Sequence, residues 1–269
     1  MADKEQTDNR QAGTTIGPRE IAVFLGPSLP LTKARAILDA TYLHPAAQGD
    51  ILLAAHAFRP KVMILIDGRF EDRPAVRHKE ILWAMAQGII VIGAASMGAL
   101  RAAELHPFGM IGVGVIFRWY RRWPLAPDDA VAVQNGPAEL GFLQLTDALI
   151  DLQATFSELA RRNMISPDIR RELVSIARQM KFRDRSLKQV LRRAGWREDE
   201  AVRILAGIVH KKSRDAQLAL AKAMDLANSY KIQSDLSFSI TNTFIRDLEA
   251  SGIDPELVYN YNKHYDVGG

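Results

Sequence analysis

Hydrophobic and polar residues alternate in blocks along the first 150 residues. Three short runs are almost wholly apolar, at 21–25 (IAVFL), 62–66 (VMILI) and 89–92 (IIVI). Apolar residues recur at helical spacing over 31–38, 49–57, 74–87 and 97–105. Apolar strands separated by helices are typical of a parallel sheet that is covered on both faces. The pattern therefore predicts a three-layer α/β domain over residues 19–150.

The second half of the chain has a different pattern, which is helical almost throughout. Helices are predicted at 139–162, 167–180, 185–195, 198–209, 214–228 and 236–250. The first of these contains a leucine series with nearly helical spacing, Leu140, Leu143, Leu145, Leu149 and Leu152. We expect an all-helical region over 151–269, with the domain boundary inside the helix that begins near Glu139. Residues 1–18 are polar and lack the apolar core of a signal peptide, so they are expected to be a disordered tail.

The amino-acid composition limits which residues are available for catalysis and metal binding. The chain of 269 residues has no cysteine, which excludes disulfides, thiolate metal ligands and a cysteine nucleophile. Any covalent step must then use Ser, Thr, Lys or a carboxylate. Asp128 and Asp129 have no His or further carboxylate close by in the sequence, so they are interpreted as a cap rather than a metal site. No apolar run reaches the ~20 residues of a membrane span, so we expect a cytoplasmic protein without a span. We also expect no metal and no cofactor.

The strongest candidate for catalysis is Ser96, in the segment 89–105 (IIVIGAASMGALRAAEL). A buried strand runs into small residues around this serine and a helix follows at once, as in a nucleophile elbow. The amide of Met97 and the small residue Gly98 would then border an oxyanion site at the helix N-terminus. The alternative interpretation is a plain N-cap serine, since serine is a favoured cap.

A nucleophilic serine requires a base, and no His–Asp pair stands at an obvious position. Lys79 is the best candidate, because it lies in the first turns of the helix that follows the second predicted strand. A lysine serves as a base when burial disfavours its charged form, and serine–lysine pairs are a known variant of the triad. His78 is the alternative base, and the residues alone favour Lys79 only slightly. Lys79 can also be read as a surface lysine.

Two further loops are expected at the carboxyl ends of the strands, where parallel sheets place their functional groups. Gly26 and Ser28 resemble a short anion-binding turn without the pattern of a P-loop. Asp67 and Gly68 follow the second strand and are candidates for binding a substrate tail, or for a plain turn. Arg101, one turn beyond Ser96, is a candidate for orienting an anionic terminus or for a solvent-exposed pair with Glu104.

These residues together resemble the TfuA-like family over roughly residues 20–150. The resemblance rests on LGPSL, on IDGRFED followed by HKEIL, on GAASMGALRAAEL, on FGMIGVGVIF, and on Asp128-Asp129 followed by AVAV. It implies a hydrolase-like Ser–Lys pair, which falls on Ser96 and Lys79 and raises Lys79 above His78. It also implies a role in peptide backbone thioamidation beside a YcaO-type enzyme, which activates backbone amides with ATP.

The family's proposed activity is hydrolysis of the C-terminal thiocarboxylate of a ThiS-like sulfur carrier, which releases sulfide for the YcaO enzyme. The resemblance thus implies three partners: the YcaO enzyme, the carrier and the precursor peptide. A different class of function stays open, in which the chain is a non-catalytic adaptor that recruits peptide or carrier to YcaO. Segment 168–215 carries 14 Lys and Arg residues against 7 Asp and Glu residues. The first interpretation is a set of solvated helix faces, and the alternative is a docking surface for an acidic carrier or peptide. No helix-turn-helix or base-stacking motif is evident, so a nucleic-acid partner is not expected.

Overall fold

A computed structural model describes residues 16–69, 73–197, 204, 207–230 and 238–262. A five-stranded parallel sheet lies at its centre, with the strand order β2-β1-β3-β4-β5. The strands are β1 (Ile21–Phe24), β2 (Thr41–Leu43), β3 (Val62–Leu65), β4 (Ile90–Ala94) and β5 (Ile111–Val113). The three apolar runs are therefore strands, and the parallel α/β prediction is confirmed.

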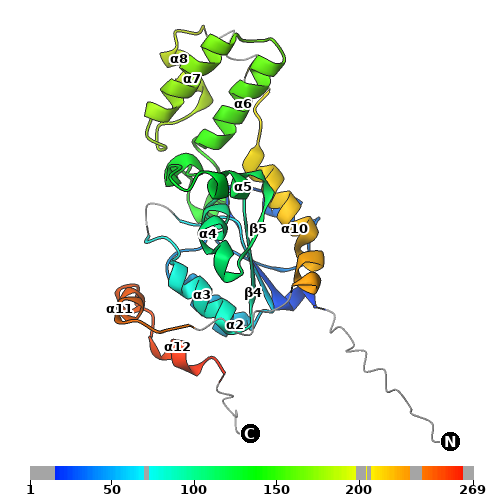
Figure 1. The fold of residues 1–269 in the computed structure, drawn as a ribbon, viewed down its shortest axis with the longest axis vertical. Coiled ribbons are helices and arrows are strands. Elements are labelled where there is room, and N and C mark those ends of the chain that lie inside the picture. The colour runs from blue at the N-terminus through cyan, green and yellow to red at the C-terminus, as the bar shows by residue number, and fades with distance from the viewer. Residues whose placement is uncertain (1–15, 70–72, 198–203, 205–206, 231–237, 263–269) are drawn as a thin grey trace, which may run out of the picture.

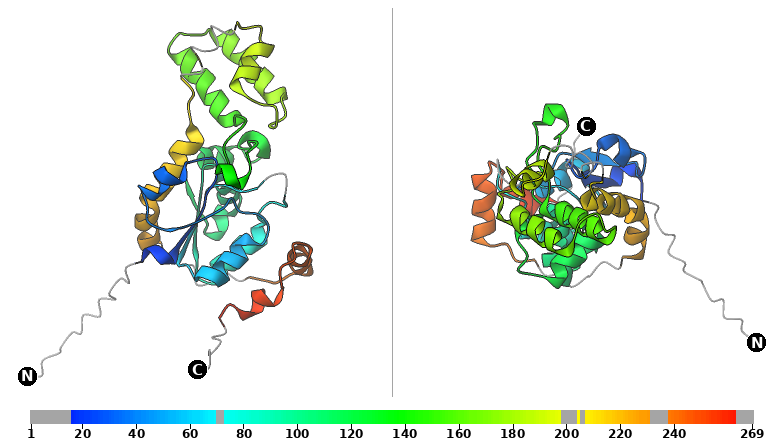
Figure 2. Two further views of the ribbon diagram at one scale, coloured as in Figure 1. Left: turned by 180° about the vertical axis from the view of Figure 1, so that it is seen from behind. Right: turned by 90° about the horizontal axis from the view of Figure 1, so that it is seen from above.

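Helices cover both faces of the sheet (Figures 1 and 2). One face packs on α2 (Asp50–Phe58), α3 (His78–Ala86), α4 (Met97–Leu105) and α5 (Gly114–Arg122). The other face packs on α1 (Leu31–Arg35) and on α10 (Lys211–Ser229), whose alanines lie against the strand residues that point to that side. Short 3-10 turns connect some of these elements, namely η1 (Pro18–Glu20), η2 (His106–Phe108), η3 (Asp128–Ala130) and η4 (Ala138–Leu140).

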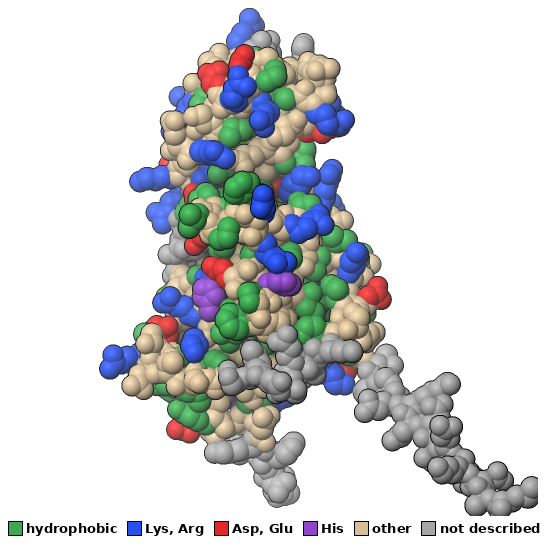
Figure 3. Space-filling view, in the orientation of Figure 1, with side chains coloured by type: hydrophobic (Ala, Val, Ile, Leu, Met, Phe, Trp, Pro, Cys, Tyr) green, Lys and Arg blue, Asp and Glu red, His purple; other side chains and the backbone are tan. Residues whose placement is uncertain are grey.

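A helical arm projects beyond the carboxyl end of the sheet (Figure 1). It contains α6 (Leu149–Arg161), α7 (Pro167–Gln179) and α8 (Leu187–Arg193), which share a core of their own. Ser166 and Ser186 cap α7 and α8 by accepting amide hydrogen bonds, so local sequence signals define both helix starts. Lys and Arg side chains are spread over this arm in Figure 3.

The last part of the chain returns to the α/β domain instead of extending the arm. After α10, helices α11 (Asn242–Ala250) and α12 (Glu256–Asn260) pack beside α2 and α3, where Trp83 Nε1 donates to the carbonyl of Val258. The expected region 151–269 is helical in its described parts, but it contributes to three separate cores. The predicted helix at 198–209 falls mainly outside the described residues, as does most of the tail at 1–18.

The predicted helix at 139–162 is wrong in its first third. Residues 134–146 form a hairpin, in which Gly136 N donates to Leu143 O at 2.7 Å and Leu145 N donates to Gln134 O at 2.8 Å. The helix α6 begins only at Leu149. Pro137 and Gly141 punctuate this segment, and both residues favour turns over helix interiors. The first three leucines of the series, Leu140, Leu143 and Leu145, are therefore exposed on a hairpin, whereas Leu149 and Leu152 are buried in α6.

Candidate functional site

Ser96 lies at the sharp turn between β4 and α4, as the sequence predicts. Ala95, the residue before it, adopts a left-handed backbone conformation with φ of 66°. Such a conformation costs an alanine roughly 1 kcal/mol or more, and strain of this kind concentrates at functional sites. Ser96 occupies the N-cap position, yet its side chain caps no amide of α4. Its Oγ instead points to the carbonyl oxygen of Val131 at 3.5 Å.

Close packing of α4 against the sheet explains the glycine after Met97. A Cβ atom added at Gly98 would lie 1.7 Å from the carbonyl oxygen of Leu65 in β3. A side chain at Gly93 would likewise approach the carbonyl oxygen of Gly98 to 2.2 Å. The two glycines therefore let the helix start directly on the strands, which fixes Ser96 at the carboxyl edge of the sheet.

Lys212, in the first turn of α10, reaches the same point from the opposite face of the sheet. Its Nζ donates to the carbonyl oxygen of Val131 at 2.9 Å, so Ser96 and Lys212 share one acceptor. The exposed fraction is 2% for each of the two residues. The structure thus brings together a buried serine and a buried lysine that are far apart in the sequence.

The surroundings of Lys212 favour its neutral form. Burial lowers the pKa of its ammonium group, while the carboxylates of Asp67 and Asp151 pull the pKa back in the other direction. Lys212 also lies at the amino end of a 19-residue helix, where the helix dipole disfavours a positive charge. Burial likewise raises the pKa of Asp151, against the attraction of Lys212. A lowered pKa is the shift that a lysine needs in order to act as a general base.

Asp151 also fixes the position of the lysine. Its Oδ1 accepts hydrogen bonds from the amides of Lys211 and Lys212, at 2.7 and 3.2 Å, and so caps the start of α10. Asp151 itself lies in α6, so the helical arm determines where α10 begins. The arm is in this way a structural part of the site.

Asp67 joins the loops that follow β1 and β3. Its carboxylate accepts from the amides of Gly26 and Ser28, at 2.9 and 3.1 Å, and from Ser28 Oγ at 2.6 Å. These loops meet where the strand order reverses, which is the usual position of ligand sites in open parallel sheets. The turn formed by Gly26 and Ser28 does bind a carboxylate, but that carboxylate belongs to Asp67.

Two neighbouring residues complete the edge of the site. Gly68 packs against the N-terminus of α4, since a Cβ atom there would lie 2.8 Å from the Cβ of Met97. The amide of Met97 is the first of the helix, and such amides have no partner within the helix. In the described residues it donates to no protein acceptor. It is available to a developing negative charge beside Ser96.

The predicted base Lys79 makes other contacts. Its Nζ donates to the carbonyl oxygen of Ser239 at 3.2 Å and lies 5.2 Å from the ring centre of Phe238. Both partners belong to the segment before α11, so the described contacts of Lys79 do not include Ser96. Pairing of Lys79 with Ser96 stays a prediction from the family resemblance, whereas the contacts of the structure favour Lys212.

His78 and Arg101 form a surface cluster with Glu104. His78 Nε2 and Arg101 Nη1 each lie 2.7 Å from Glu104 Oε2. Arg101 Nε also donates to the carbonyl oxygen of Val76 at 2.9 Å. Burial would raise the pKa of Glu104, but the bonds from His78 and Arg101 outweigh it, and its pKa is lowered. The described contacts of this cluster lie within α3, α4 and the turn before α3.

Arg185 is a second residue that sequence reasoning missed. Its side chain is buried, and its Nη2 contacts Asp129 Oδ2 at 2.6 Å while its Nη1 donates to the Asp129 carbonyl at 3.2 Å. This holds η3, which leads directly to Val131. Asp129 is therefore an ion-pair partner and not the cap that the sequence predicts. Among the described residues no three His, Asp or Glu side chains gather as a metal site requires.

The fold and the site define a class of protein: a parallel α/β protein with a buried serine and a buried lysine that share an acceptor at the carboxyl edge of the sheet. Residues 67–186 match the model of the TfuA-like protein family. This confirms the resemblance found in the motifs. The matched segment contains Ser96, Asp129 and Arg185, while Ser28 and Lys212 lie outside it.

No curated protein matches the chain. The family is associated with YcaO-type enzymes and indicates a role in thioamidation. No helix in the described part of the chain is both long enough and apolar enough to cross a bilayer.

Proposed function

We propose that this protein hydrolyses the C-terminal thiocarboxylate of a ThiS-like carrier and thereby supplies sulfide to a YcaO enzyme. The observation that supports the proposal is that Ser96 and Lys212 both donate to one acceptor, the carbonyl oxygen of Val131. The family assignment supplies the YcaO context. The absence of cysteine in the chain fits a mechanism in which the sulfur stays on the carrier.

The chemical steps follow from the positions of these groups. Neutral Lys212 accepts the proton of Ser96 as Oγ attacks the thiocarboxylate carbon, and the Met97 amide donates to the oxyanion. The carbon–sulfur bond then breaks, and Lys212 returns the proton to the sulfur, which leaves as hydrosulfide. Water, deprotonated by Lys212, hydrolyses the acyl-serine and leaves a carboxylate on the carrier. Lys212 Nζ must leave Val131 O to reach Ser96, so we infer that substrate binding displaces the Val131 segment.

The adaptor function is the second candidate, and one observation favours it. Ser96 and Lys212 are both enclosed in this conformation, as they would be if they were structural. The two functions differ in what happens when Ser96 is changed. An adaptor without catalysis would keep its effect on thioamidation in a Ser96→Ala variant.

The test is sulfide release from a purified thiocarboxylated carrier, with Ser96→Ala as the variant. The hydroxyl makes only a long contact with Val131, so we expect the variant to unfold at nearly the same temperature as the wild type. Sulfide release should fall on the order of 10³-fold or more, as it does when a nucleophilic serine is removed. Equal release by both proteins would contradict the hydrolase and leave the adaptor.

A further inference from the structure

The hairpin at residues 134–146, here named the site hairpin, begins three residues after Val131. Its two strands are held by the bonds of Gly136 and Leu145 and by the bridge between Asn135 and Gln144. Gln134 N also donates to Thr146 Oγ1 at 2.7 Å, which closes its base. The site hairpin is therefore only a few residues from the carbonyl that Ser96 and Lys212 share.

The outer side of the site hairpin is apolar and faces solvent. Leu140, Leu143 and Leu145 are 64%, 59% and 56% exposed. Residues two apart on a strand point to the same side, so Leu143 and Leu145 form one face. Three leucines exposed within six residues form a local apolar patch, and such patches mark interaction sites. We name these three residues the leucine face.

Phe142, at the tip of the site hairpin, holds it down on the rest of the domain. Its ring is buried and packs edge-on against His44, with ring centres 5.2 Å apart, and the guanidinium of Arg69 lies 5.9 Å away. The backbone of Phe142 is left-handed, with φ of 57°, which is rare for a bulky residue. The amide oxygen of Asn135 is buried without a hydrogen-bond partner in the described structure. The described ring contacts of Phe142 are thus with His44 and Arg69, and its left-handed backbone is strained.

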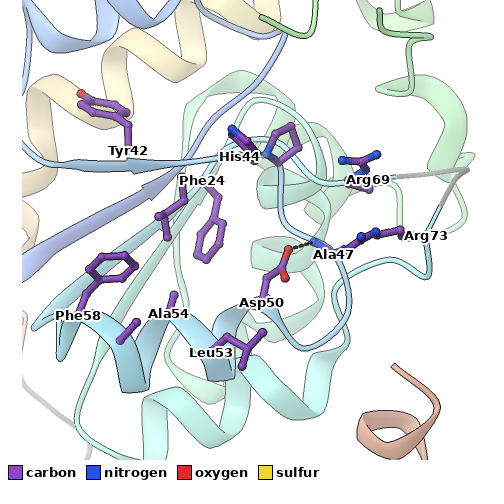
Figure 4. Close-up of a pocket in the computed structure, with 13 residues that line it drawn as sticks. Phe24, Tyr42, His44, Ala47, Asp50, Leu53, Ala54, Phe58, Arg69 and Arg73 are labelled. Atoms are coloured by element: carbon purple, nitrogen blue, oxygen red, sulfur yellow. Dashed lines mark hydrogen bonds between the residues drawn. The ribbon is translucent and has the colours of Figure 1, made fainter. Parts of the chain in front are cut away.

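The partners of Phe142 also line a cavity of about 480 Å³ between β2 and α2 (Figure 4). Arg73 joins His44 and Arg69 in its lining, while Phe24, Leu53 and Phe58 are among its apolar residues. Among the described lining residues Asp50 is the one acidic side chain, and its carboxylate accepts from the amide of Ala47 at 2.8 Å. The cavity thus suits an extended segment that carries both negative charge and an apolar side chain.

From these contacts we propose that the leucine face docks the sulfur-carrier protein. This proposal rests on the function proposed above. The anionic C-terminal segment of the carrier enters past His44, Arg69 and Arg73, displaces Phe142 and uncovers Ser96. The carrier is the occupant because Ser96 is only 2% exposed, so substrate must bring binding energy that opens the site hairpin. Burial of the leucine face against the carrier would supply that binding energy. The arginines in the neighbouring cavity lining complement an acidic chain end. The surface that fits it on the carrier is an apolar patch beside its acidic C-terminal tail.

Accessibility of residue 96 tests this without any turnover. The chain has no cysteine, so Ser96→Cys introduces one thiol whose alkylation by iodoacetamide reports exposure. In this background the carboxylate form of a ThiS-like carrier should speed alkylation about tenfold, because a ligand that binds the open state shifts the population toward it. Phe142→Ala should speed alkylation without any carrier, since it removes the contact with His44.

The leucine face is tested by adding Leu143→Ser and Leu145→Ser to the Ser96→Cys chain. We expect the carrier to lose its effect on alkylation in this variant. The matched control is Leu125→Ser, because Leu125 is 99% exposed but lies in the loop after α5. The control should respond to the carrier as fully as the parent does.

Two results would overturn the docking proposal: no acceleration by the carrier in the parent, or equal acceleration in the leucine variant. Sulfide release by chains that retain Ser96 separates this from the proposed function. Release that is equally efficient with and without the leucine changes overturns the docking site while the hydrolase stands. Acceleration that depends on the leucines, without any sulfide release, supports docking and overturns the hydrolase.

Discussion

Two lysines on opposite faces of the sheet differ in their burial and in their hydrogen-bond partners. Lys79, in α3, is partly exposed and bonds to the carbonyl of Ser239. Lys212, in α10, is buried, has a lowered pKa and shares an acceptor with Ser96. Position along the chain favours Lys79, whereas burial and contact favour Lys212. A lysine with a lowered pKa is thus identified by its burial, which distant segments of the chain create.

The largest expected effect is on catalysis by variants of these two lysines. Lys212→Met should lower sulfide release on the order of 10³-fold, because the serine loses its base. Lys79→Met is the matched control and should stay within about twofold, as expected of a residue outside the site. Release is measured on the thiocarboxylated carrier at pH 7.5. The opposite ranking of the two variants would return the base to Lys79.

Folding must be checked in the same experiment, since Lys212→Met leaves Asp67 and Asp151 without their cation. A second variant, Lys212→Arg, keeps the charge but cannot act as a base at this pH. We expect it to be as inactive as Lys212→Met. An active Lys212→Arg protein would mean that the lysine acts only through its charge.

The next largest effect concerns the packing that fixes Ser96. Gly98→Ala places a methyl group where the Leu65 carbonyl oxygen is 1.7 Å away, so strand or helix must shift. We expect the free energy of unfolding in urea to fall by at least about 3 kcal/mol. Gly207→Ala, where the nearest atom is 3.5 Å away, is the control and should change it little. Equal effects at both glycines would show that α4 tolerates a looser contact.

A smaller effect is expected where the helical arm holds the site. Arg185→Met removes both contacts with Asp129 and should lower the free energy of unfolding by about 2–3 kcal/mol. The control is Arg171→Met, because Arg171 is exposed and in the described structure pairs with its helix neighbour Asp168, an interaction that contributes little to stability. Sulfide release should fall in the first variant alone, since η3 leads to Val131. Unchanged sulfide release in Arg185→Met would show that the helical arm does not affect catalysis through η3.

The last prediction is a dependence of stability on pH that arises far from Ser96. Burial raises the pKa of Glu80 to about 8, against hydrogen bonds from the amides of Arg77, Gly49 and Ile51. Between pH 4.5 and 8 the folded protein keeps a proton that the unfolded carboxyl releases, so the free energy of unfolding should fall as pH rises. The total change is on the order of a few kcal/mol. Urea denaturation at several pH values should show this slope in the wild type and lose it in Glu80→Gln.

The sequence predicts the central strands and the Ser96 turn because apolar runs and small residues have local causes. It misses β2 and β5 because each has three residues, and β5 contains Gly112, which favours neither state. It also misreads 139–148, since leucines at nearly helical spacing lie on a hairpin. Spacing alone does not show that Pro137 and Gly141 break the pattern.

Lys212 escapes sequence analysis for a different reason. Its neighbours in the chain, Lys211 and Arg214, are ordinary features of a basic segment. Its burial comes from Val131, Asp67 and Asp151, which three other parts of the chain provide. One weak signal exists, because α10 carries alanines on the face that follows Lys212 toward the sheet. That face predicts a buried helix and so a buried lysine at its start.

The most direct test of the central claim is the pH dependence of Ser96 labelling by a fluorophosphonate, with the labelled residue identified by mass spectrometry. We predict that Ser96 reacts, and that its rate rises with pH around an apparent pKa below the ordinary lysine value of 10.5, because burial lowers the pKa of Lys212. The rise should be absent in Lys212→Met and unchanged in Lys79→Met. A serine that stays unlabelled at every pH, or a rise that disappears only in Lys79→Met, would contradict the account.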